Sequence, residues 1–205
     1  TWLRKTLKAD GITPGHAAAT SAAPAKATVL ASIDSPPMST LVRLTNKDSD
    51  NFFAETLLKD IGRDASGVGS TAEGVRAVRT FAAGAGATIQ LIDGSGLDHG
   101  DRAAPRDVVS LLVAERNRPE FPALYASLPI AGVDGTIYDR MRTGPAKRNC
   151  RAKTGSLTCV SALSGFCTTR SGRTVAFSFL MNGLSVSYAR RIQDRMAQTI
   201  AGWTG

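Results

Sequence analysis

The last third of this sequence restricts its fold most, because strand-like runs follow one another there and a helical pattern comes after them. The runs cover residues 150–156, 160–169 and 173–181, and turn-forming residues separate them. In the helix that follows, one face carries the large apolar side chains Tyr188, Ile192, Met196, Ile200 and Trp203. The pattern predicts an antiparallel three-stranded meander covered by a C-terminal helix.

Helical patterns dominate the chain before the meander. Apolar residues recur there at helical spacing, with capping or helix-ending residues at the boundaries. The expected helices cover residues 1–10, 51–62, 70–86 and 105–118. Gly11 and Gly62 are expected to end the first two, Ser70 or Thr71 to cap the third, and Pro105 to open the fourth.

The remaining segments carry shorter patterns. Residues 14–28 predict a loop, residues 87–93 a short strand, and residues 120–141 a mixed segment with turns near Gly132 and Gly135. Helices followed by an antiparallel meander predict an α/β fold of the layered α+β kind rather than a doubly wound one.

Composition and charge narrow the class of protein. The chain is 42% hydrophobic and 20% charged, which is typical of a globular protein. No run approaches the roughly 18 apolar residues of a membrane-spanning helix. The net charge of +8 would favour an anionic partner, but the basic residues are scattered and no nucleic-acid module is recognisable. We predict a solvated basic surface without a nucleic-acid partner, and keep a nucleic-acid-associated domain as a distant alternative.

The cysteines are Cys150, Cys159 and Cys167. There is no C-x-x-C pair, and both histidines lie far away in the sequence, which argues against zinc. If the first two strands form a hairpin, Cys150 and Cys167 lie opposite one another, so we predict a disulfide between them and an oxidising compartment. Buried reduced cysteines in a cytosolic protein remain the alternative.

The acidic loop over residues 93–101 partly resembles a calcium-binding loop, because it contains Asp93, Asp98 and Asp101. Leu97 stands where such a loop needs an oxygen ligand, and Ala104 stands where it needs a glutamate. We predict instead a turn whose carboxylates accept hydrogen bonds from backbone amides, with no metal.

Two short motifs carry the chemistry: Ser49-Asp50-Asn51 before a helix and Lys153-Thr154-Gly155 on a strand. Together with S-x-x-K they form the signature of penicillin-binding proteins and class A β-lactamases. Acyl transfer by a serine needs a proton path to the leaving amine and backbone N–H groups for the oxyanion. Two structural interpretations stay open: Ser49 as a helix cap, and Lys153 as a solvated lysine at a strand edge.

Four longer segments resemble one family, the serine-type D-alanyl-D-alanine carboxypeptidases of peptidase family S13 (class C low-molecular-mass penicillin-binding proteins). They are "SPPMSTLVRLTNKDSDNFFAETLLKDIG", "LIDGSGLDHGDRAAPRDVVSLL", "LPIAGVDGTIYDRM" and "RAKTGSLTCVSALSGF". The resemblance covers most of residues 30–185 and implies part of a penicillin-binding, β-lactamase-like domain. It also implies hydrolysis of the terminal D-Ala-D-Ala bond of peptidoglycan stem peptides, and cleavage of cross-links as an endopeptidase, through an acyl-enzyme. The enzyme would be extracytoplasmic, with β-lactams as inhibitors and no cofactor.

The resemblance also implies roles for individual residues. The catalytic residues would be Ser49, Asn51 and Lys153, and the substrate-binding residues would be Thr154, Gly155 and Ser156. Ser49 would relay a proton, Asn51 would hold the acyl side chain, and Lys153 with Thr154 would meet the substrate carboxylate. The backbone N–H of Ser156 would be an oxyanion-hole donor. Asp93 and Ser95 would belong to a structural loop.

One family motif is absent from these 205 residues, because no lysine follows a serine by three positions. Thr56 precedes Lys59 at that spacing, but it lies in the helix after Ser49. We therefore expect residues 1–205 to be the C-terminal portion of one catalytic domain, inactive alone and partnered by the remaining N-terminal part. A non-catalytic peptidoglycan-binding or regulatory fragment is the alternative.

Overall fold

The computed structural model describes residues 2–15 and 26–205, in two units, Thr1–Ser35 and Pro36–Gly205. The first unit contains helix α1 (Trp2–Ala9), none of whose residues is buried. Gly11 follows it with a positive φ of 78°, as expected of a residue that ends a helix. Most of the predicted loop over 14–28 lies outside the described residues.

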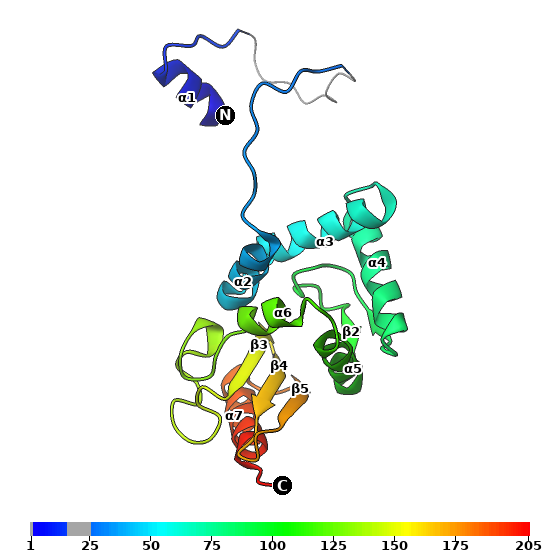
Figure 1. The fold of residues 1–205 in the computed structure, drawn as a ribbon, viewed down its shortest axis with the longest axis vertical. Helices are drawn as coiled ribbons and strands as arrows, with labels where there is room; N and C mark the ends of the chain where they lie inside the picture. Colours follow the sequence, from blue (N-terminus) through cyan, green and yellow to red (C-terminus); the bar gives the residue numbers. More distant parts are fainter. Residues whose placement is uncertain (1, 16–25) are drawn as a thin grey trace. The chain divides into compact units, whose positions relative to one another are not determined.

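The second unit combines helices with two antiparallel sheets (Figure 1). Its helices are α2 (Met38–Asp48), α3 (Asn51–Ser66), α4 (Thr71–Gly84), α5 (Pro105–Arg116), α6 (Phe121–Ser127), the 3-10 helix η1 (Gly135–Ile137) and α7 (Val186–Gly202). Its strands are β1 (Ile89–Gln90), β2 (Arg102–Ala103), β3 (Cys150–Leu157), β4 (Val160–Thr168) and β5 (Thr174–Asn182). The predicted mixed helix and antiparallel sheet architecture is confirmed.

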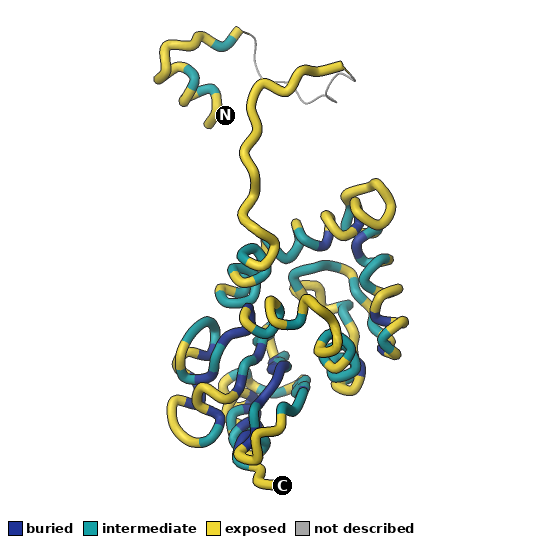
Figure 2. Tube along the Cα trace, in the orientation of Figure 1, coloured by how far each residue is buried: buried dark blue, intermediate teal, exposed yellow. Residues whose placement is uncertain are grey.

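The main sheet has the order β3-β4-β5, and all its pairs are antiparallel. Helix α7 packs on one face of this sheet, while α5 and α6 lie on the other side (Figure 1). Buried residues gather along the strands and α7 (Figure 2). Because side chains alternate along a strand, Cys150 and Ala152 face the α7 side, and Arg151 and Lys153 face the opposite side.

Helix α7 buries a different face from the one predicted. Its buried residues are Ala189, Gln193, Ala197 and Ala201, one position along from the large apolar series. Of that series Tyr188, Met196 and Trp203 are 49%, 40% and 42% exposed. The alanines allow the helix axis to lie close to the sheet, so the larger side chains flank the contact. The buried Gln193 amide is satisfied, because its Nε2 donates to Ser161 Oγ at 3.1 Å.

Two helix boundaries refine the sequence predictions. Gly62 does not end α3, which continues to Ser66 and ends at Gly67 with a φ of 81°. Gly62 is buried instead, because α4 crosses α3 there and a Cβ on Gly62 would lie 2.6 Å from Gly74 N. Of the two candidate caps of α4, Ser70 is the one used, and its side chain accepts from Glu73 N at 3.2 Å.

The β3–β4 hairpin pairs Cys150 with Cys167, and the two form the predicted disulfide. Cys159, in the turn between the strands, is free and exposed. We expect thiol titration of unfolded protein to find one thiol before reduction and three after it. Because the bridge closes a loop of 17 residues, its removal should cost about 3 kcal/mol of stability. Three thiols in unreduced protein would contradict the disulfide.

Candidate active site

The junction between α2 and α3 presents Ser49. This residue ends α2 in the left-handed conformation, with φ 56° and ψ 48°. The next residue, Asp50, is the N-cap of α3, and its side chain accepts from Phe53 N at 2.9 Å. The interpretation of Ser49 as the cap of α3 is therefore wrong, since Asp50 takes that position. The Ser49 hydroxyl is therefore not the capping group of α3.

Lys153 meets Ser49 across the space between the sheet and the helices. Its Nζ lies 2.7 Å from Ser49 Oγ and 2.8 Å from the Thr154 carbonyl oxygen. Burial lowers the pKa of the Lys153 amine below its ordinary value. The interpretation of Lys153 as a solvated edge lysine is wrong, because its amine is partly buried and bonded to a residue 104 positions away. One hydrogen bond thus joins the two sequence motifs.

A cleft of about 470 Å³ contains this contact. Ser49 and Asn51 line it from the helical side, and Lys153 and Thr154 line it from the sheet. Gly155 and Ser156 follow on β3 beyond this lining. Asn51 is exposed at the start of α3. The sequence therefore identified residues from distant segments that share one cavity.

The acidic loop forms another wall of the cleft, through residues 93–96. Asp93 accepts hydrogen bonds from the N–H groups of Gly96, Leu97 and Asp98, as predicted for a carboxylate turn. Burial alone would raise the pKa of Asp93, but hydrogen bonds from backbone N–H groups and from the Ser95 and Asp101 side chains together hold that pKa below its ordinary value. Glu55, on α3, accepts from Gly94 N at 2.9 Å and Ser95 N at 3.0 Å. Nothing in the sequence distinguishes Glu55 beyond its place in a predicted helix.

The outer edge of β3 is only partly paired. Ala152 N donates to Pro129 O, and Ala131 N donates to Cys150 O. In an antiparallel strand alternate residues direct their backbone groups to the same side, so the Thr154 and Ser156 N–H groups also face this outer edge. Among the described residues, neither N–H has a backbone acceptor. The Ser156 N–H is therefore available beside the cleft.

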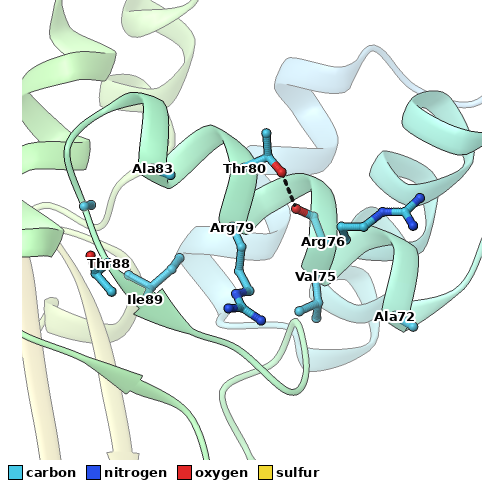
Figure 3. Close-up of a pocket in the computed structure, with 9 residues that line it drawn as sticks. Ala72, Val75, Arg76, Arg79, Thr80, Ala83, Thr88 and Ile89 are labelled. Atoms are coloured by element: carbon cyan, nitrogen blue, oxygen red, sulfur yellow. Dashed lines mark hydrogen bonds between the residues drawn. The ribbon is translucent and has the colours of Figure 1, made fainter.

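Another cavity lies on α4 and β1, where Arg79 lies between Ile89 and Val75 (Figure 3) and Arg76 also contributes to the lining. It contains none of the motif residues, and Arg76 is ion-paired with Glu73. Within residues 2–15 and 26–205, no group of three or more His, Cys, Asp or Glu side chains could hold a metal ion. The Ser49–Lys153 cleft is the stronger candidate for chemistry.

The antiparallel sheet and its covering helices place this chain in the penicillin-binding and β-lactamase-like class of folds. Penicillin-binding protein 4 from Haemophilus influenzae, solved with a β-lactam, superposes with a TM-score of 0.84 and 28% identity, over 96% of this chain and 50% of that one. A class A β-lactamase from Bacteroides cellulosilyticus shares the fold, with a TM-score of 0.61 and 19% identity over 80% of this chain and 63% of that one.

Within that class the chain belongs to the peptidase S13 family, D-Ala-D-Ala carboxypeptidase 3, which it matches over residues 1–202. The D-alanyl-D-alanine carboxypeptidase of Actinomadura sp. (strain R39) is 37% identical over 87% of this chain and 35% of that protein. The enzyme DacB of Haemophilus influenzae is 34% identical over 79% of this chain and 35% of that protein. The chain thus spans about a third of these relatives. No helix of the described residues is long and apolar enough to cross a membrane.

Proposed function

We propose that the intact protein containing this chain is a serine-type D-Ala-D-Ala carboxypeptidase that acts on peptidoglycan stem peptides through an acyl-enzyme. The observation that carries the proposal is the 2.7 Å contact between Lys153 Nζ and Ser49 Oγ inside the cleft. It joins two of the three signature motifs of penicillin-binding proteins. The attacking serine and its base would come from a segment outside these 205 residues.

The contact supports a proton path to the leaving group. Because Lys153 Nζ donates to Ser49 Oγ, the Ser49 hydroxyl proton is free to point into the cleft. As the peptide bond breaks, Ser49 would give this proton to the departing D-Ala amine and take one from the Lys153 ammonium. Burial lowers the pKa of Lys153, which makes its ammonium a better proton donor.

The edge of β3 supports the binding roles. The Ser156 N–H faces outward and has no backbone partner among the described residues, as an oxyanion donor must. The Thr154 hydroxyl would bind the substrate carboxylate. Within the described part of the chain, a Cβ at Gly155 would meet only Ala162 Cβ, at 3.4 Å, so packing there does not demand glycine. A bare backbone instead suits a substrate lying along the strand. Asn51 would hold the acyl side chain from the helical wall.

The compartment and inhibitors follow from the same assignment. A disulfide between Cys150 and Cys167 favours an oxidising environment, and we infer an extracytoplasmic location at the cell wall. The related H. influenzae protein was solved with a β-lactam, which supports inhibition of this protein by β-lactams. The absence of S-x-x-K from these 205 residues favours a second candidate, binding of peptidoglycan without catalysis.

A penicillin-labelling experiment tests the proposal. The intact protein and the 205-residue chain are incubated separately with fluorescent penicillin, denatured and analysed by gel and intact mass. We expect covalent labelling of the intact protein, blocked by excess unlabelled penicillin, and release of D-Ala from a D-Ala-D-Ala peptide. We expect no labelling of the 205-residue chain. An unlabelled intact protein would favour binding without catalysis, and a labelled short chain would contradict the externally supplied nucleophile.

A further inference from the structure

A second polar connection joins the helical side to the sheet, behind the Ser49–Lys153 contact. It begins at Lys47, two positions before Ser49 on α2. Lys47 Nζ donates to both carboxylate oxygens of Asp134, at 2.7 and 2.8 Å, and to Leu128 O at 2.6 Å. The Lys47 side chain is only 13% exposed. A largely buried lysine with three close acceptors is a fixed anchor rather than a solvated charge.

The anchored carboxylate fixes the segment that contains η1. Asp134 Oδ1 also accepts from Ile130 N at 2.8 Å, which closes the turn before η1. Gly135 then has a φ of 58°, and a Cβ there would lie 2.8 Å from Pro129 Cβ and 3.1 Å from Lys47 O. The turn therefore lies directly against the end of α2. This packing determines where the next residue, Thr136, can place its side chain.

Thr136 completes the connection at the sheet. The Thr154 hydroxyl donates to Thr136 Oγ1 at 2.8 Å, and both residues are partly buried. Thr154 is next to Lys153, so two contacts link β3 to the helical side: Lys153 with Ser49 at the end of α2, and Thr154 with Thr136 in η1. A hydroxyl both donates and accepts. Thr136 can therefore donate to Thr154 Oγ1 when the Thr154 proton turns toward an anionic ligand.

We propose that Thr136 is a positioning residue that holds the Thr154 hydroxyl for the substrate carboxylate, and that the Lys47–Asp134 ion pair holds Thr136 in place. This inference rests on the proposed function of the cleft. Two hydroxyls in series strengthen one another's hydrogen bonds, and the final bond to a carboxylate is charge-assisted. Without Thr136, the Thr154 side chain loses the partner that selects its orientation.

The test compares Thr136→Val with Thr136→Ser in the intact protein. Valine keeps the branched shape and removes the hydroxyl, whereas serine keeps the hydroxyl. The rate constant of acylation is measured with benzylpenicillin, which has a free carboxylate, and with its methyl ester, which does not. Thr136→Val should slow acylation by benzylpenicillin about tenfold and acylation by the ester less than about twofold. Thr136→Ser should restore most of the lost rate.

The ratio of the two rate constants is the decisive readout, because a loss of folded protein lowers both equally. Lys47→Met should lower the same ratio, since it releases Asp134. Thr199→Val is the matched control, because the Thr199 hydroxyl bonds to its own helix at Arg195 O. An unchanged ratio in Thr136→Val overturns the positioning role, as does a ratio in Thr136→Ser as low as in Thr136→Val. Absence of acylation in the unsubstituted protein overturns the proposed function, and this inference with it.

Discussion

Replacing Lys153 with methionine should slow penicillin acylation of the intact protein about a thousandfold, because it removes a proton donor and a positive charge from the cleft. Methionine has a similar length and no charge to bury, so the half-buried position should still be filled. The measurement is the rate of covalent labelling at pH 7. Lys59→Met is the matched control, since Lys59 is exposed on α3 and does not line the cleft. Labelling of Lys153→Met within about tenfold of the unsubstituted protein would contradict this role.

The same substitution should change how stability depends on pH. Burial lowers the pKa of Lys153 in the folded protein below its ordinary value of 10.5, which the unfolded chain regains. At pH values between the lowered pKa and 10.5, the unfolded state binds more protons at this lysine than the folded state does. The lysine therefore makes the free energy of unfolding rise with pH. The difference in free energy of unfolding, unsubstituted minus Lys153→Met, should therefore increase from pH 7 to pH 9.5. Urea unfolding at both values measures it, and a decrease would contradict the lowered pKa.

The sheet and its disulfide could be predicted because the relevant signals are local. Alternation over three neighbouring runs fixes an antiparallel meander, and the spacing of Cys150 and Cys167 then follows from the register. The cleft residues Ser49 and Lys153 could be named because each belongs to a known short motif. Their contact spans 104 positions, and only the packed structure shows that it is 2.7 Å long.

The cap of α3, the buried face of α7 and the contacts of Lys47 and Thr136 could not be predicted, because no local sequence pattern indicates them. Ser49 and Asp50 are both good capping residues, and only the left-handed turn at Ser49 decides between them. The buried face of α7 was misplaced because large apolar residues dominate a periodicity argument, whereas the close approach to the sheet selects alanine. Lys47 and Thr136 reach partners 87 and 18 positions away, so nothing near them in the sequence shows their contacts.

The helical side of the cleft depends on a close helix crossing, so Gly74→Ala should destabilise the protein severely. A Cβ on Gly74 would overlap Leu58 O and lie 2.8 Å from Leu58 Cγ, which forces α4 away from α3. Leu58 also packs beneath Gly94 of the acidic loop. We expect a loss of about 3 kcal/mol in the free energy of unfolding, because the conflict is with backbone rather than with a movable side-chain end.

Gly84→Ala, at the other end of the same helix, separates this steric effect from a change in helix propensity. A Cβ on Gly84 would meet none of the described residues within 4 Å, so alanine there should be neutral or stabilising by up to about 1 kcal/mol. Urea unfolding of both variants measures the difference, and equal stabilities would contradict the close crossing. Helix α3 begins at Asn51 and carries Glu55, so moving the helix crossing should also disturb the cleft. The Gly74→Ala protein that remains folded should therefore be acylated by penicillin more slowly. Gly84→Ala should leave the rate unchanged.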